Sequence, residues 1–313
     1  MTKHYSGKIG EFDYDDKEFR IEEDHLFYIG TASDGSDVII PEGVTECSYL
    51  FFRHNIKNTM KNPPVIPESV TDCSSMFSDC ANLETAPVIP ANANKCSLMF
   101  ARCSSLRKAP VIPDKVTNCM SMFQFCTGLE EVPNFPASLH NASFMFTGCT
   151  HLKSVPGELP EGVKECQSTF SMCELLEKAP TLPDSVADCS SVFAGCTSIR
   201  NAPDIPANVK NCQYMFSQCR SITEPPRILN NILSYAGLFS GCTSMTKAPE
   251  IPSNASKCCN MFAYCESITE PPVLPEGILD ARSMFLGCTG LTRRPELPGS
   301  LKKTDDMFEG CNV

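Results

Sequence analysis

One 23-residue unit repeats through most of this chain, and this repeat constrains the fold more than any other feature of the sequence. A phenylalanine shows the period most clearly, because successive copies lie 23 residues apart with one exception of 24. Self-similarity at a fixed period of about 20 to 50 residues is typical of a solenoid. We therefore expect stacked coils. The phenylalanine column comprises Phe77, Phe100, Phe123, Phe146, Phe170, Phe193, Phe216, Phe239, Phe262, Phe285 and Phe308.

Other columns of the unit indicate which residues face inward. In the copy that begins at Cys73, a second cysteine follows at Cys80, an aliphatic residue at Leu83 and prolines at Pro87 and Pro90. Inward residues of one coil stack on the same residues of the next, so each column needs a nearly constant volume. Free cysteine meets this need as a small buried hydrophobe.

The two halves of the unit predict different backbone conformations. The segment from the first cysteine to the second contains no proline, which favours a short helix or 3₁₀ turn. The stretch from the leucine column to the second proline is extended, and because proline cannot donate to a strand ladder, its paired part is expected to be only three or four residues.

The spacing Val70-x-x-Cys73-x-x-Met76-Phe77-x-x-Cys80-x-x-Leu83 resembles the BspA-like class of leucine-rich repeats, in the Met-Phe variant of mycoplasma-type surface lipoproteins. The resemblance covers residues 41–313. It implies a leucine-rich-repeat-like α/β solenoid, with short parallel strands and short helical or 3₁₀ turns. Members of the family are mostly bacterial and protist surface proteins, many of them adhesins.

We predict two parts: an N-terminal β cap over residues 1–40, and a solenoid of about eleven to twelve coils over residues 41–313. The strand-like segments 12–14 and 18–21 flank Asp15-Asp16-Lys17, which indicates a small β-hairpin or meander. This part would cap the open core or serve as a separate binding head. At the other end the last coil stops mid-unit, so a partner or a second copy of the protein would cover it, or the end is frayed.

Composition argues against several classes of function. The net charge of −11 disfavours a nucleic-acid-binding groove, and no run of about 18 apolar residues suggests membrane insertion. Without a visible secretory signal, the twenty cysteines are interpreted as buried, reduced thiols of a cytoplasmic protein. No Cys-x₂-Cys pair indicates a metal site, and no phosphate loop or nucleophile elbow indicates a cofactor or an active site. We predict that the protein is not an enzyme.

Two sets of variable residues are candidates for protein binding. Charged pairs after the leucine column alternate in sign from coil to coil, so they either form a self-neutralising ladder or a recognition stripe; they include Arg107, Lys108, Glu130, Glu131 and Lys153. Apolar residues also replace polar ones on the other side of the coil, where they form an exposed patch or pack locally; these are Leu98, Met120, Phe125 and Phe144, with Tyr214 and Tyr264 as weaker candidates. Val88 and Val111, between paired prolines, add apolar surface elsewhere.

The sequence thus favours a non-enzymatic scaffold that binds a protein partner in the cytoplasm. Its size and acidity would suit a regulator or inhibitor, such as one encoded by a phage or mobile element. The alternative is the usual role in the family that it resembles, an adhesin-like module at the cell surface that binds a host protein or glycan after export by a route that the sequence does not show.

Overall fold

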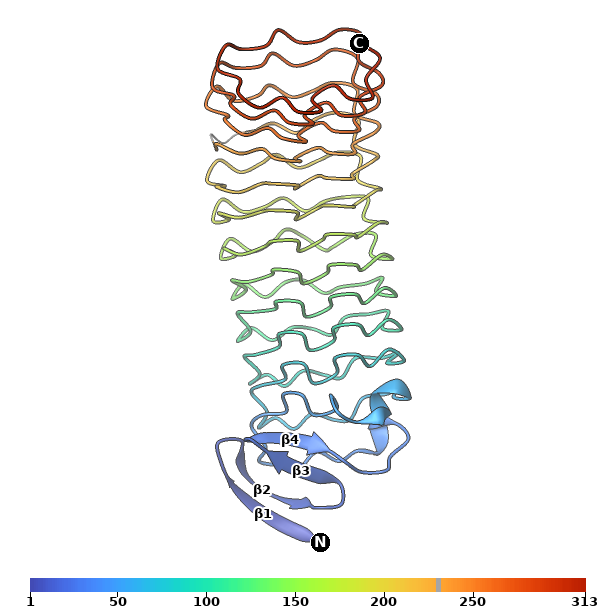
Figure 1. Cartoon of the computed structure of the whole chain (residues 1–313). Helices are drawn as coiled ribbons and strands as arrows, with labels where there is room; N and C mark the ends of the chain where they lie inside the picture. The colour runs from blue at the N-terminus through green and yellow to red at the C-terminus, as the bar shows by residue number, and fades with distance from the viewer. Residues whose placement is uncertain (229–231) are drawn as a thin grey trace. The chain divides into compact units, whose positions relative to one another are not determined.

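The computed structural model describes residues 1–228 and 232–313, and the chain divides into two compact units, Met1–Leu152 and Lys153–Val313. Within each unit, successive turns of the chain stack one on another, as the predicted solenoid requires (Figure 1). The hairpins and the first coils belong to the same compact unit. The division of the chain at residue 40 into a cap and a solenoid stays a prediction.

Two antiparallel hairpins open the chain. Strand β1 (Thr2–Gly7) pairs with β2 (Gly10–Asp15), and β3 (Phe19–Glu22) pairs with β4 (His25–Tyr28). The segment Asp15-Asp16-Lys17 therefore joins two hairpins and does not form the turn of one. The first strand lacks a strong apolar alternation, which is why the sequence did not reveal it as the partner of β2.

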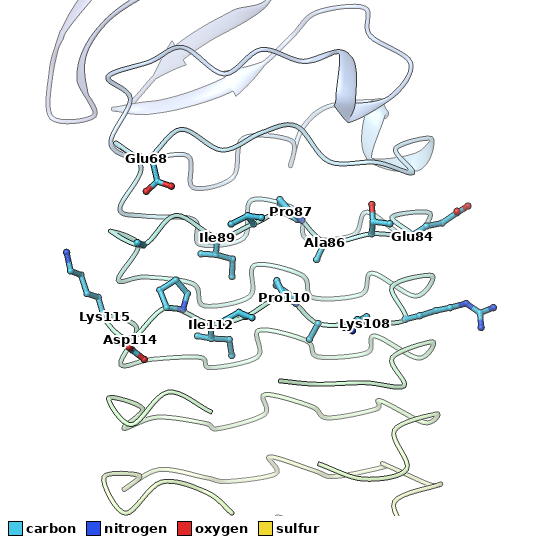
Figure 2. Close-up of a pocket in the computed structure, with 17 residues that line it drawn as sticks. Glu68, Glu84, Ala86, Pro87, Ile89, Lys108, Pro110, Ile112, Asp114 and Lys115 are labelled. Carbon is cyan, nitrogen blue, oxygen red and sulfur yellow. The ribbon is translucent and has the colours of Figure 1, made fainter. Parts of the chain in front are cut away.

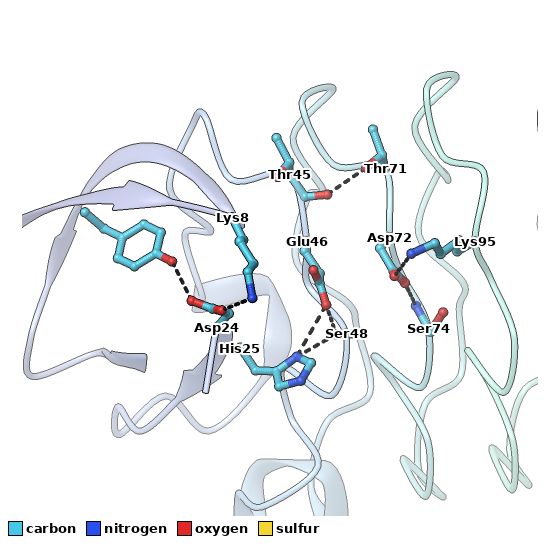
Figure 3. Close-up of polar contacts among 11 residues, drawn as sticks. Lys8, Asp24, His25, Thr45, Glu46, Ser48, Thr71, Asp72, Ser74 and Lys95 are labelled. Atoms are coloured by element: carbon cyan, nitrogen blue, oxygen red, sulfur yellow. Dashed lines mark hydrogen bonds and ion pairs between the residues drawn. The ribbon is translucent and has the colours of Figure 1, made fainter. Parts of the chain in front are cut away.

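Polar contacts tie the hairpins to each other and to the first coil (Figure 3). The Asp24 carboxylate accepts hydrogen bonds from Tyr5, at 3.2 Å, and from Lys8, at 2.9 Å. The Ser48 hydroxyl in the first coil lies 3.0 Å from Nδ1 of His25 and donates to Glu46 at 2.8 Å. Two short 3₁₀ turns, η1 (Gly35–Asp37) and η2 (Asn55–Asn58), follow the hairpins.

The segment between the two cysteine columns is a chain of tight turns, where the sequence favours a short helix or 3₁₀ turn. In the coil that begins at Cys73, Ser75 has φ 54° and Asp79 has φ 64°. The same two positions are left-handed in every later coil. Helical φ and ψ cannot persist through such residues, so the segment forms turns and not a continuous helix.

Alternate hydrogen bonds explain this turn conformation. The amide of Met76 donates within its coil to Cys73 at 3.2 Å, whereas the amide of Phe77 donates to Met99 of the next coil at 2.9 Å. A helix would direct every N–H along its own chain and leave the neighbouring coil without partners. The observed turns satisfy both the coil and the stack, as buried backbone groups require.

Parallel pairing is most regular just before the first cysteine column. Single in-register bridges join Glu46 to Asp72, Asp72 to Lys95, and Lys95 to Asn118. The leucine-to-proline stretch, where we expected the strand, carries only scattered bridges such as Lys108 to Glu131. Its prolines lack the N–H groups that a continuous ladder needs, so this face consists of extended, mostly unpaired chain.

The core of each unit is a stack of phenyl rings beside a ladder of thiols. The ring centroids of Phe100 and Phe123 lie 5.5 Å apart with an interplanar angle of 4°, which is an offset-stacked arrangement. The thiol of Cys126 donates to the carbonyl oxygen of Phe100 in the preceding coil at 3.0 Å. Cysteine thus fills a small inward space and also links adjacent coils, which alanine could not do.

All twenty cysteines are free thiols, and all but Cys259 and Cys311 are buried. Burial disfavours the thiolate and raises the pKa of Cys119 and of Cys126 to about 12. Both thiols are therefore protonated, inert parts of the core at neutral pH.

Candidate functional site

A stripe of β-branched aliphatic side chains is exposed on the leucine-to-proline face of the first unit. It comprises Ile39, Val65, Val88 and Val111, whose relative exposures are 84%, 87%, 84% and 75%. Each residue lies two positions before the last proline of its coil. Because the coils are paired in register, these four side chains occupy equivalent places in four successive coils. We call this set the aliphatic stripe.

Local sequence forces the stripe outward. In Pro87-Val88-Ile89-Pro90 the chain is extended, so alternate side chains point to opposite sides. Ile89 is directed inward and buried, and Val88 between its buried neighbours must face solvent. The same alternation buries Ile112 and exposes Val111.

Val88 and Val111 lie in a shallow groove of about 860 Å³ (Figure 2). Pro87, Ile89 and their counterparts in the next coil line its middle, with Glu84 and Lys108 toward one side. Toward the other side the groove is lined by Glu68, Asp114 and Lys115. The site is thus an apolar floor with charged rims of both signs.

The stripe is restricted to the first unit. In the second unit the same position holds polar residues except at Val273, which is 88% exposed and stands alone between coils with glutamate at this place. The polar residues are Glu158, Thr181, Asp204, Arg227, Glu250 and Glu296. Isolated exposed aliphatic residues are ordinary, whereas a contiguous exposed patch marks an interaction surface.

The charged residues singled out from the sequence form inter-coil ion pairs beside the groove. Arg107 lies 3.0 Å from Glu130, and Lys108 lies 3.2 Å from Glu131. All four side chains are at least half exposed, so each pair contributes at most about 1 kcal/mol. This geometry fits the self-neutralising ladder. Lys153 belongs to the second unit and is exposed there.

The off-pattern apolar residues lie on the turn segments of three adjacent coils but not at one equivalent position. Met120 and Phe125 are partly exposed, whereas Leu98 and Phe144 are half-buried. The guanidinium carbon of Arg102 lies over the Phe125 ring, 5.8 Å from the ring centroid. The structure therefore shows partial local packing at these residues, and their role in binding stays a prediction.

Left-handed glycines make room for the large residues of the turn segments. A Cβ atom on Gly148 would lie 2.4 Å from the Phe125 ring, and one on Gly237 would lie 2.2 Å from the Tyr214 ring. Gly287 has the same relation to Tyr264. Each aromatic side chain thus lies over the next coil, which leaves Tyr214 and Tyr264 dispersed along the second unit.

Sequence reasoning noted Val88 and Val111 but missed Ile39 and Val65 as members of the same stripe. The signal that could have found them is the position before each final aliphatic-proline pair, which is apolar in the early coils and polar later. Val65, Val88 and Val111 follow the period of 23, but Ile39 lies 26 residues before Val65, because the first coil carries three extra residues between Phe51 and Phe77.

The described residues show no arrangement suited to metal binding or membrane insertion. No group of three or more His, Cys, Asp or Glu side chains within residues 1–228 and 232–313 is placed to hold a metal ion. Among the same residues, no helix has the length and hydropathy needed to cross a bilayer. The groove can bind another molecule through apolar contacts on its floor and through the charged residues on its rims.

Comparison with known proteins agrees with this architecture. A family model described as the BspA type leucine rich repeat region matches residues 23–130, 121–226 and 213–313, in 6 copies. No curated protein sequence matches the chain significantly.

Two solved structures resemble the fold. A leucine-rich repeat protein from Bacteroides ovatus has a TM-score of 0.53 and 21% identity, and the match covers 98% of this chain and 93% of that one. A leucine-rich repeat protein from Eubacterium ventriosum has a TM-score of 0.50 and 13% identity, over 100% and 96%. At these identities the likeness shows the fold alone.

Proposed function

Because the chain belongs to the BspA-type leucine-rich repeat family, whose repeats serve as protein-binding scaffolds, we propose that it is a non-enzymatic scaffold that binds a partner through the aliphatic stripe. The observation that supports this proposal is the exposure of four β-branched side chains at equivalent places in successive coils, two of which, Val88 and Val111, line one groove. A monomer gains nothing by leaving such a surface in water, since its burial is worth about 25 cal/mol per Å².

The spacing of the stripe favours an amphipathic helix as the bound element. Equivalent phenyl ring centroids in adjacent coils of the first unit lie 5.5 to 5.6 Å apart, whereas side chains on one face of an extended strand are about 6.6 to 6.8 Å apart. One turn of an α-helix rises about 5.4 Å. A helix along the stripe can therefore place one apolar residue against each coil for about three turns, whereas an extended chain would soon lose register.

Val88→Asp/Val111→Asp is expected to weaken binding of such a helix by roughly a hundredfold. Burial of one valine side chain is worth about 1.5 to 3 kcal/mol, and each 1.4 kcal/mol corresponds to about tenfold in affinity. The measurement is to select peptides from a displayed library of random 16-residue sequences and then titrate the enriched peptides by fluorescence anisotropy against each variant. The enriched sequences should carry aliphatic residues at helical spacing.

Val273→Asp is the matched control, because it makes the same change at the same coil position outside the stripe, and its affinity should equal that of the unchanged protein. A Phe125→Asp/Phe144→Asp variant tests the turn segments. The proposal is wrong if the library yields no peptide that depends on the stripe, if enriched peptides alternate with a period of two, or if only the turn-segment variant loses binding.

We further propose that the protein acts in the cytoplasm as a regulator or inhibitor. Its twenty free thiols support a reducing compartment, since disulfides form and persist mainly in oxidising ones. Fractionation of the native host should recover the protein with cytoplasmic markers. Cleavage by a protease added to intact cells would instead support an adhesin-like module at the surface.

A further inference from the structure

A second concave site lies between the β3–β4 hairpin and the first coil, away from the aliphatic stripe. It has a volume of about 590 Å³, and its lining includes Glu22, Glu23, Phe27, Tyr49 and Phe52. Aromatic rings form its walls, since Tyr49 and Phe52 meet at 74° with centroids 5.8 Å apart. His25 meets Tyr49 edge-on at 5.7 Å. We call this site the aromatic pocket.

The backbone around the aromatic pocket holds its groups in place. Glu23 and Asp24 form the hairpin turn with φ 52° and 60°, a conformation that usually requires glycine or asparagine. Lys8 and Tyr5 hold Asp24 in this turn, which leaves Glu23 exposed at the edge of the pocket. Tyr49 is also left-handed, with φ 60°, and 39% of it is exposed.

The rings already accept cations from the chain itself. The guanidinium of Arg53 lies 4.9 Å from the Phe27 ring centroid and 2.9 Å from the Glu22 carboxylate. The ammonium of Lys57 lies 5.5 Å from the Phe52 ring centroid. Aromatic faces attract cations through the ring quadrupole, and a planar guanidinium can also stack on them.

One carboxylate of the pocket is still available. Glu22 pairs with Arg20 and Arg53, but within the described residues the Glu23 carboxylate has no ion pair or hydrogen bond. We propose that the aromatic pocket binds an arginine side chain of a partner protein, stacked on Tyr49 and paired with Glu23. The proposal is independent of the stripe, because it concerns another surface and another chemistry.

The probe is a blocked tripeptide, acetyl-Gly-Arg-Gly-amide, added to the full-length ¹⁵N-labelled protein while the amide signals of Glu23, Tyr49 and Phe52 are followed by NMR. Its counterpart with citrulline has nearly the same shape without the charge. We expect saturable shifts with the arginine peptide in the millimolar range, and at least tenfold weaker binding of the citrulline peptide.

Glu23→Gln should weaken binding of the arginine peptide by threefold or more. Glu161→Gln, which removes an exposed charge in the second unit, should leave the affinity unchanged. Tyr49→Ser should also weaken binding of the arginine peptide. This variant should fold, because serine occupies the equivalent left-handed position at Ser75 in the next coil. Arg53→Ala should strengthen binding, since the peptide can then reach Phe27 and Glu22. Equal shifts with citrulline, an equal effect of Glu161→Gln, or no shift at all would overturn the proposal.

Discussion

The protein is expected to unfold cooperatively when the pH is raised from about 9 to about 10. Burial raises the pKa of seven thiols from an ordinary value of 9.0 to about 12: Cys80, Cys119, Cys126, Cys166, Cys212, Cys258 and Cys288. The folded state therefore keeps protons that the unfolded state loses above about pH 9. Stability is fully present below that pH and falls as the pH rises toward 12.

The loss of folding free energy at alkaline pH is large enough to unfold the protein. By about pH 10 each of the seven thiols favours the unfolded state by roughly 1 kcal/mol, and together, over the two units, they amount to a loss on the order of 10 kcal/mol. Such a loss is comparable to the whole free energy of unfolding of a typical domain, which is about 5 to 15 kcal/mol. Circular dichroism during an alkaline titration under reducing conditions measures it.

A Cys119→Ala variant provides the control for the alkaline transition. Alanine fits this column, since Ala142 occupies the same position in the next coil and is fully buried. Removing one thiol should reduce the dependence of the unfolding free energy on pH by up to about 1.4 kcal/mol per pH unit above pH 9. A fold that persists unchanged at about pH 10.5 would contradict the prediction, as would an identical pH dependence in the two proteins.

Phe123→Ala is expected to destabilise the first unit by about 3 to 5 kcal/mol, the usual cost of removing a large buried aromatic side chain. Phe123 is fully buried and stacks on Phe100 at 5.5 Å and on Phe146 at 5.6 Å. Because a solenoid is stabilised mainly by contacts between neighbouring coils, the cavity weakens two interfaces. Urea unfolding followed by circular dichroism gives the change in free energy.

Phe125→Ala is the matched control, two residues further along the same coil. Its side chain is 36% exposed and lies on Gly148 and beneath Arg102. We expect a loss of less than about 1 kcal/mol, as is typical of surface contacts. Equal losses in the two variants would mean that the stacked rings do not form the core.

The repeat made the solenoid and its inward columns predictable, because stacked positions tolerate little change in volume. Phe77, Cys80 and Leu83 are all fully buried, as their columns indicate. The conformation of the turn segments was not predictable, because leucine, phenylalanine and tyrosine at Leu98, Phe144 and Tyr214 rarely adopt positive φ. Hydrogen bonds between coils impose that conformation, and they depend on the stack as a whole.

The candidate site was predictable only in part. Pairing between charged neighbours could be anticipated from their alternating signs, and the ion pair of Arg107 and Glu130 has the expected register. The aliphatic stripe was harder to recognise, because the three extra residues of the first coil put Ile39 out of the 23-residue period. Contacts between the hairpins and the first coil, such as that of His25 with Ser48, join segments that follow no common period.

A photo-crosslinking measurement tests the stripe as a binding surface most directly. Benzoylphenylalanine would replace Val88 in one protein and Val273 in another, and each would be irradiated with the best peptide selected from the library. We expect a crosslink at Val88 and none at Val273, with the crosslinked peptide residues spaced one helical turn apart. Equal crosslinking at the two positions, or none at Val88 while the peptide still binds, would contradict it.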